Sequence, residues 1–347
     1  SAGGNFATAV GALITETDQV DNLLGVVMFD GVSRAPLFTD SLAALDAAGI
    51  PDYQIAAIAQ RWNAWGVATE LMEQLYPDRF NGVQIDNGSH TDVIAGDSLF
   101  ARIAEIASAI IVRPSPPGAK EAVRTFATGW VNDIYGGYSP SNPFYGIYGN
   151  PNDGTYVGNQ IIDMGQITAT TLPSPPAVDV AQYSGTWYEQ GSVKQFFSIG
   201  LVNTKAVYTP QAGGTIRVEN SGNYFGPNGP QSSIVGSAVP VNTANTRLNV
   251  GFFLGEPSAT EPGNYWILDY APDYSWAIVG DPSGFSGYIL TREQTFRADN
   301  PDAYDALVTR ARQLGVWGPI TPTEQFPTPG SGASLPGPAE LPAGIVV

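Results

Sequence analysis

The chain has 347 residues, 43% of them hydrophobic, and this is enough apolar material for two domains with cores of their own. Its formal net charge is −17, with 32 acidic against 15 basic side chains, and such an acidic surface argues against binding nucleic acid or anionic membranes. The absence of cysteine and the presence of a single histidine exclude disulfides, a thiol nucleophile and the usual cysteine or histidine metal sites. We therefore expect neither a metal nor another cofactor.

The first third of the chain alternates between helix-like and strand-like segments. A continuous apolar run, typical of a strand buried on both faces, occupies residues 23–30. Residues 53–59 are a second candidate for a buried strand, and residues 80–86 are a third expected strand. Helical patterns occupy residues 7–15, 41–48, 67–75, 99–111 and 120–134. This alternation predicts a parallel sheet with helices on both faces. Three strands are too few for a stable sheet of this kind, so we expect a further element to complete it.

Gly, Pro, Asn and Tyr dominate from about residue 136 to 176, and this composition predicts a linker. Within it, the oxygen atoms of Asn150, Asn152 and Asp153 suit calcium, but their spacing does not fit an EF-hand loop and no glutamate follows at the closing position. Turn formation explains these three residues better.

From residue 183 the hydrophobic pattern changes to a period of two, with turn residues between short strands. The strands are expected at residues 202–210, 214–220, 247–254, 263–270, 275–282 and 287–293. This pattern predicts an antiparallel barrel or sandwich. A helix is expected over residues 302–314, with Asn300 as N-cap, Pro301 in its first turn and Gly315 as its stop. Residues 319–347 are rich in Pro, Gly and Ser and predict a mobile or extended tail.

The chain opens with Ser1-Ala2-Gly3-Gly4 and runs directly into a helix. Small residues here allow a helix to pack tightly against a strand while the serine is held at the helix N-terminus. This opening resembles the nucleophile elbow of the α/β-hydrolases, in which G-x-S-x-G lies between a strand and a helix. The resemblance implies that Ser1 is the nucleophile and that the backbone amide of Ala2 donates to the oxyanion. The Gly-x half of the motif, which would precede Ser1, lies outside this sequence.

The single histidine, His90, lies in a loop just after the third expected strand. In α/β-hydrolases the catalytic residues follow the order serine, acid, histidine, and the histidine lies in the loop after the last core strand. The resemblance therefore implies that His90 acts as general base toward Ser1 and then as general acid toward the leaving alcohol.

The acid is chosen from several carboxylates. In the family it most often follows the strand before the histidine strand, but residues 59–65 there contain no carboxylate. The preceding strand ends with Asp30, a position that some lipase-like members use, so we assign the acid to Asp30. A turn-forming role is the alternative for this residue. Glu70 and Asp86 are further options, and Asp92 fits better as a residue that shapes its loop.

An α/β-hydrolase also needs the strands that precede its nucleophile. We therefore expect an N-terminal hydrolase fragment as a partner that completes the sheet. Three explanations stay open: cleavage of a longer precursor next to the serine, a sequence that is itself a fragment, and a true N-terminal nucleophile that uses its own amine as base. The alternating pattern does not support the third.

The segment Gly185-Thr186-Trp187-Tyr188 is followed by two aromatic-rich strands at residues 263–270 and 275–282. These segments, in this order, resemble the lipocalins of the bacterial outer-membrane type, whose signature is G-x-W. The resemblance implies an eight-stranded antiparallel barrel flanked by a C-terminal helix. It also implies that Gly185 allows a bend, that Trp187 closes one end of the barrel, and that Arg292 stacks on this tryptophan.

Lipocalin barrels hold one small apolar ligand, and the resemblance implies the same here. Strand parity suggests Tyr208, Phe252 and Trp266 as residues that line the ligand site. The strand alternation alone does not identify the ligand.

These patterns predict a multidomain chain: the C-terminal half of an α/β-hydrolase over residues 1–135, a linker over 136–176, a lipocalin barrel and helix over 177–318, and a tail over 319–347. The expected function is hydrolysis of an apolar acyl ester, such as a lipid, wax or polyester, with the barrel holding substrate or fatty-acid product. The alternative is a non-catalytic lipid carrier with an inactive hydrolase scaffold. Export is usual for both families, so we expect a secreted or cell-envelope protein, although no signal peptide is visible.

Overall fold

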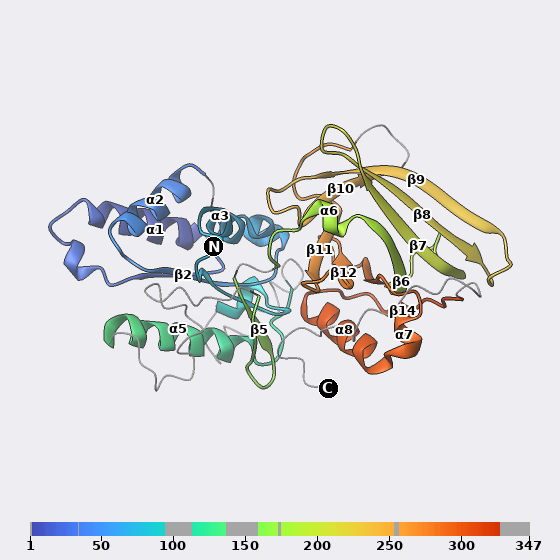
Figure 1. The fold of residues 1–347 in the computed structure, drawn as a ribbon. Coiled ribbons are helices and arrows are strands. Elements are labelled where there is room, and N and C mark those ends of the chain that lie inside the picture. Colours follow the sequence, from blue (N-terminus) through green and yellow to red (C-terminus); the bar gives the residue numbers. More distant parts are fainter. Residues whose placement is uncertain are drawn as a thin grey trace. The chain divides into compact units, whose positions relative to one another are not determined.

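The structure is a computed structural model. It describes residues 2–33, 35–93, 113–136, 159–172, 175–252 and 257–326. The chain divides into two compact units, Ser1–Ser174 and Pro175–Val347, each with its own sheet (Figure 1). The expected helix over residues 99–111 and the cluster of Asn150, Asn152 and Asp153 lie outside the described residues.

The first unit contains a five-stranded mixed sheet in the order β1-β2-β3-β5-β4. Strands β1 (Val26–Phe29), β2 (Asp52–Ala56) and β3 (Gly82–Ile85) pair in parallel, as the sequence pattern predicts. Strand β5 (Thr168–Thr171) pairs antiparallel with β3, and β4 (Ile161–Asp163) pairs antiparallel with β5.

Strands β4 and β5 correct the expectation of a linker over residues 136–176. The turn between them, closed by a hydrogen bond from Gly165 N to Asp163 Oδ1 at 2.7 Å, supports a short hairpin. Thr168 and Thr170 of β5 donate to Asp86 at the end of β3, at 2.7 and 2.9 Å. The hairpin therefore adds to the sheet on the β3 side. The Gly- and Tyr-rich residues 137–158 lie outside the described part.

Helices cover both faces of this sheet (Figure 1). On one face lie α1 (Ala2–Thr15), α2 (Leu37–Ala47) and α3 (Val67–Leu75). Val26 and Met28 of β1 are buried in one cluster with side chains of α2 and α3. The alternating sequence pattern anticipates this layer.

The opposite face is covered by α5 (Ala119–Gly136). Phe126 and Trp130 of this helix are fully buried and pack on Tyr53 of β2. The rings of Tyr53 and Trp130 have centroids 5.3 Å apart. Three short 3₁₀ helices lie between the main elements of the described part, at Val20–Asn22 (η1), Arg61–Gly66 (η2) and His90–Val93 (η3).

The second unit is an antiparallel sheet in which eight strands close into a barrel. The strands are β6 (Gly185–Val193), β7 (Leu201–Pro210), β8 (Ile216–Tyr224), β9 (Gln231–Pro240), β10 (Arg247–Gly251), β11 (Tyr265–Tyr270), β12 (Trp276–Gly280) and β13 (Gly287–Thr291). Consecutive strands are neighbours, and β13 returns to pair with β6, which closes the barrel. This confirms the expected eight-stranded barrel. A short helix, α6 (Val180–Tyr183), precedes it.

The expected C-terminal helix is α8 (Pro301–Gln313), which packs on the outside of the barrel beside α7 (Phe296–Asp299) (Figure 1). Asn300 stands at the N-cap position, but its side chain does not accept from the helix amides. Instead its Nδ2 donates to Phe296 O at 3.3 Å, because α7 ends immediately before it. Asn300 is therefore the N-cap residue, as predicted, but it does not cap the helix through its side chain.

The expected tail begins later than residue 319. Residues Ile320–Pro322 form β14, which pairs with the second half of β6. Gln325 Nε2 then donates to the carbonyl oxygens of Glu189 and Thr204, both at 2.9 Å. This segment extends the sheet where β6 and β7 stop pairing, and polar backbone contacts of this kind leave no mark in an apolar sequence pattern.

Candidate functional site

The barrel interior is lined by buried apolar and aromatic side chains. All eight strands contribute side chains to one cluster, which we call the inner cluster. Its members on the strands are Trp187, Tyr208, Ile216, Val218, Ala238, Leu248, Ile267, Ala277, Val279 and Leu290. Five more side chains pack against this cluster yet keep part of their surface exposed: Ala206, Val250, Phe252, Tyr265 and Tyr288.

One end of the barrel is closed by Trp187 and Arg292. Trp187 is fully buried, and its Nε1 donates to Tyr183 O at 2.7 Å. The guanidinium carbon of Arg292 lies 3.8 Å from the centre of the tryptophan ring, the arrangement that the family resemblance implied. The guanidinium also donates to Thr186 O at 2.8 Å. Gly185 has a φ of +95°, which a residue with a side chain adopts only with strain.

Three tyrosine hydroxyls meet inside the barrel. The Oη atoms of Tyr183 and Tyr265 are 2.8 Å apart, and Tyr208 Oη donates to Tyr265 Oη at 2.9 Å. Burial raises the pKa of Tyr208 to about 12 and, as the main cause, raises the pKa values of Tyr183 and Tyr265 well above the usual value. All three hydroxyls are therefore protonated at neutral pH.

The three residues chosen by strand parity differ in where they lie. Tyr208 belongs to the buried inner cluster, and Phe252 packs against it. Trp266 does not face the interior: Arg247 stacks on its ring, with the guanidinium carbon 4.7 Å from the ring centre, while its neighbour Tyr265 packs inward. The parity assigned to β11 is thus wrong by one residue, which moves every side chain of a strand to the other face.

Exposed aromatic side chains gather at the end of the barrel opposite Trp187. Strand β6 runs away from Trp187, so the loops that follow β6, β8 and β12 share the far end of an up-and-down barrel. These loops carry Phe196, Phe225 and Phe285, of which Phe196 and Phe225 are 88% and 86% exposed. Gln195 Nε2 donates to Phe285 O at 3.2 Å and so connects two of the loops.

Sequence reasoning missed a buried acidic residue on β6. Glu189 is almost fully buried and accepts from Lys194 Nζ at 2.7 Å and from Ser192 Oγ at 2.6 Å. Its carboxylate is therefore paired and hydrogen-bonded, which is what burial of a charge requires. A single glutamate in an alternating strand does not reveal from the sequence that it will be buried and paired. We assign Glu189 a structural role.

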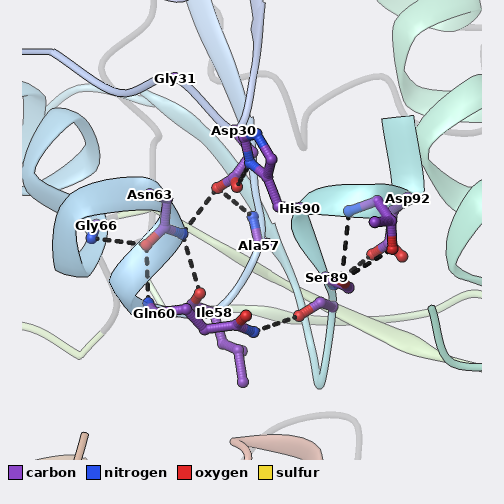
Figure 2. A network of polar contacts seen from close by, with 12 residues as sticks. Asp30, Gly31, Ala57, Ile58, Gln60, Asn63, Gly66, Ser89, His90 and Asp92 are labelled. Atoms are coloured by element: carbon purple, nitrogen blue, oxygen red, sulfur yellow. Dashed lines mark hydrogen bonds and ion pairs between the residues drawn. The ribbon is translucent and has the colours of Figure 1, made fainter. Parts of the chain in front are cut away.

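In the first unit, Asp30 and His90 come together at the carboxyl ends of β1 and β3. Asp30 is buried, and its Oδ2 contacts Nδ1 of His90, whose side chain is 24% exposed (Figure 2). The other carboxylate oxygen, Oδ1, accepts from Ala57 N and from Asn63 Nδ2, both at 3.0 Å. Such a carboxylate orients an imidazole through Nδ1 and leaves Nε2 for proton transfer.

Asn63, which sequence reasoning did not single out, holds the loop that surrounds Asp30 (Figure 2). Its Oδ1 accepts from Gln60 N at 2.8 Å and from Gly66 N at 3.0 Å. The loop contains Ala64 and Trp65 at φ values of +51° and +62°, a conformation that costs free energy at each residue. The asparagine contacts support a strained backbone next to the Asp30–His90 pair.

The start of α1 lies close to the same pair. Ala2 is the first residue of α1, so its amide is among those without a partner inside the helix. A Cβ placed on Gly4 would lie only 2.9 Å from the Cα of Gly31, the residue that follows Asp30. The first turn of α1 therefore packs directly on the Asp30 loop, as the small residues of the opening segment suggest. Ser1 lies outside the described residues.

The alternative acids have other partners. Asp86 accepts from the Thr168 and Thr170 hydroxyls and so fixes the hairpin to β3. Glu70 lies on α3 and accepts from Gln74 Nε2 at 3.4 Å. Asp92 accepts from Ser89 N at 2.7 Å, which supports the expected role in shaping the loop. Burial raises the pKa of Asp92 to about 6.

Among the residues that the structure describes, no group of three or more His, Asp or Glu side chains is arranged to hold a metal ion. Within the same residues, none of the helices has both the length and the apolar character needed to cross a bilayer.

Comparisons with known proteins concern the second unit. Residues 178–323 match the family described as "Lipocalin-like domain". Temperature-induced lipocalin-1 of Arabidopsis thaliana is 33% identical over 143 residues, which cover 40% of this chain and 74% of the plant protein. A putative lipocalin of Acanthamoeba polyphaga mimivirus is 31% identical over 140 residues, 39% of this chain and 78% of the viral protein. Lobster apocrustacyanin A1 aligns with a TM-score of 0.32 and 14% identity over 42% of this chain and 79% of its own.

Proposed function

Because the chain belongs to the lipocalin family through its residues 178–323, we propose that its barrel binds one small, largely apolar molecule. The observation that best supports this proposal is the inner cluster, in which apolar side chains from all eight strands meet inside the barrel and several of their neighbours stay partly exposed. An apolar ligand that loses about 300 Å² of exposed surface there gains roughly 7 kcal/mol. After the entropic cost of association, this corresponds to a weak or moderate affinity.

Blocking the interior tests this proposal. Ala206 faces inward on β7, opposite Trp187, and Lys205 beside it is exposed. Ala206→Trp is expected to abolish the fluorescence enhancement of the uncharged dye N-phenyl-1-naphthylamine. Lys205→Trp adds the same side chain to the outer face and is the matched control. Unchanged dye binding in the folded Ala206→Trp protein would refute binding inside the barrel.

A second function, ester hydrolysis by the first unit, is supported by the contact between Asp30 and His90. In this proposal Ser1 Oγ attacks the ester carbonyl, and Nε2 of His90 accepts the proton and passes it to the leaving alcohol. Water, deprotonated by the same nitrogen, then releases the acid from the acyl-enzyme and restores Ser1. Asp30 stabilises the imidazolium, and the amide of Ala2 donates to the oxyanion.

The hydrolase proposal also requires a partner. Among the described strands β1 pairs only with β2, so its other edge can accept a strand from an N-terminal hydrolase fragment. An apolar acyl ester is the proposed substrate, and the barrel would hold that ester. The close packing of Gly4 on Gly31 supports a nucleophile near Asp30.

A serine-reactive fluorophosphonate probe separates the two functions. If the first unit is an esterase, the probe labels Ser1, and both Ser1→Ala and His90→Ala abolish labelling. Asp30→Asn is expected to slow labelling by orders of magnitude, because the imidazole loses its oriented tautomer. Absence of labelling in an assembled, folded protein that still binds the dye would leave the ligand-binding function alone.

A further inference from the structure

Tyr183, Tyr208 and Tyr265, which we call the tyrosine trio, have more hydroxyl protons than hydrogen bonds between them. Three hydroxyls carry three protons, and two hydrogen bonds connect them. No other described residue accepts a hydrogen bond from these hydroxyls. Whichever way the bond between Tyr183 and Tyr265 is oriented, one O–H of the trio therefore has no acceptor.

An unused donor at this depth costs free energy. Tyr183 and Tyr208 are each only 6% exposed, and a buried donor without an acceptor gives up its hydrogen bond to water without replacement. Tyr265 keeps part of its surface exposed although it packs against the inner cluster. Tyr265 is therefore the least buried member of the trio, and an acceptor would approach the trio on its side.

We infer that the trio is a polar anchor that donates one hydrogen bond to an uncharged oxygen of the bound ligand. This inference rests on the proposed ligand-binding function and specifies its ligand: an apolar chain or ring system with a carbonyl or hydroxyl oxygen at one end. Most other members of the inner cluster are aliphatic, among them Ile216, Val218 and Leu248, and would contact the hydrocarbon part.

The surroundings of the trio select a neutral oxygen over a carboxylate. Burial of a charge requires a counter-ion, and Arg292 is the cation whose charge acts on Tyr183. Its guanidinium donates to the carbonyl oxygens of Gln182 at 2.7 Å and Thr186 at 2.8 Å, and it stacks on Trp187. The arginine is thus committed to the barrel floor. The tyrosine hydroxyls remain protonated and neutral, so they match an uncharged acceptor.

The position of the trio also sets the direction of binding. The rings of Tyr183 and Trp187 have centroids 5.0 Å apart, which places the anchor at the closed end of the barrel. The oxygen therefore enters first, and the hydrocarbon tail extends toward the loops that carry Phe196 and Phe225.

Three ligands of equal chain length test the anchor in the wild-type protein: n-decane, 2-decanone and decanoate, each competing with N-phenyl-1-naphthylamine. In a purely apolar cavity the ketone binds more weakly than the alkane, because it gives up hydrogen bonds to water without replacement. With the anchor, 2-decanone binds at least as tightly as n-decane, and decanoate binds most weakly. A strong preference for n-decane would overturn the inference.

The variant Tyr183→Phe/Tyr208→Phe/Tyr265→Phe removes all three hydroxyls and keeps the rings. It is expected to shift the ratio of the two dissociation constants toward n-decane by roughly tenfold, the effect of one neutral hydrogen bond. Tyr304→Phe is the matched control, because this buried tyrosine lies in the cluster under α8, outside the inner cluster. An unchanged ratio in the triple variant would also overturn the inference.

These outcomes separate the anchor from the function on which it rests. If the wild-type protein binds neither the dye nor any of the three ligands, the proposed function fails and the anchor fails with it. If it binds the dye and n-decane but shows no use of the ketone oxygen, ligand binding stands and the anchor alone is refuted. The wild-type comparison decides the matter even if the triple variant does not fold.

Discussion

The guanidinium carbon of Arg292 lies 3.8 Å from the centre of the Trp187 ring, and the same guanidinium bonds to backbone carbonyls of Gln182, Thr186 and Tyr274. Arg292→Ala removes the ring contact and leaves these carbonyls without their donor. We expect it to lower the free energy of unfolding by about 2–4 kcal/mol. Urea denaturation followed by tryptophan fluorescence measures this loss.

Arg292→Lys should restore only a small part of that stability, because an ammonium group cannot donate in a planar fork. Arg217→Ala is the control: it breaks an exposed pair with Glu219 and should cost less than about 1 kcal/mol. Equal losses at the two arginines would show that Arg292 does not hold the barrel floor.

A buried ion pair fixes α8 to the barrel. Arg310 Nε donates to Asp269 Oδ2 at 3.0 Å, and both side chains are at most 2% exposed. Asp269→Ala leaves the guanidinium charge buried and should reduce the unfolding free energy by about 3–5 kcal/mol. The double variant Asp269→Leu/Arg310→Met should be clearly more stable than Asp269→Ala, because it removes both charges. If the loss of unfolding free energy in the double variant equals the sum of the losses in the two single variants, the two side chains are not coupled.

Long elements with a strong pattern were predictable from the sequence. Helix α3 has the predicted limits, Val67–Leu75, because a helical apolar stripe ends there just before Pro77. Strand β9 was not predicted, because its Ser and Gly residues weaken the alternation on which the prediction depends. Strands β4 and β5 were missed for a related reason: they are short and lie in a segment whose composition is typical of a linker.

The candidate sites were predictable only in part. Asp30 and His90 were found through the order of residues in a known motif, and the structure places them in contact. Asn63, which supports Asp30, was not found, because a hydrogen bond across 33 residues leaves no local pattern. Tyr265 was missed because the choice of Trp266 depended on strand parity, and one bulge in β11 is enough to make parity unreliable.

The stability of the first unit should depend on the protonation of Asp92. Burial raises its pKa from 3.8 to about 6, so the folded state binds the proton more tightly than the unfolded state. The stabilising contribution of this group is therefore complete below pH 3.8 and is lost as the pH rises through about 6.

Asp92→Asn keeps this side chain neutral and can still accept from Ser89 N. We expect it to be more stable than wild type by about 2 kcal/mol at pH 7, with the difference shrinking toward zero near pH 4. Thermal unfolding at several pH values measures the difference, and Asp18→Asn, at an exposed position, is the control. A difference that does not change with pH would contradict the assignment.

The close approach of α1 to the Asp30 loop predicts an unusual effect of alanine. In an exposed helix position Gly→Ala stabilises by about 1 kcal/mol, because glycine loses more backbone freedom on folding. At Gly4 the new methyl group would lie 2.9 Å from the Cα of Gly31, so Gly4→Ala must push the helix away from the residue next to Asp30. We expect a loss of about 1–3 kcal/mol in unfolding free energy. Gly3→Ala, exposed in the same helix, should be neutral or stabilising. If Gly4→Ala behaves like Gly3→Ala, the first turn of α1 does not pack on the Asp30 loop, and the structural support for a nucleophile beside His90 is lost.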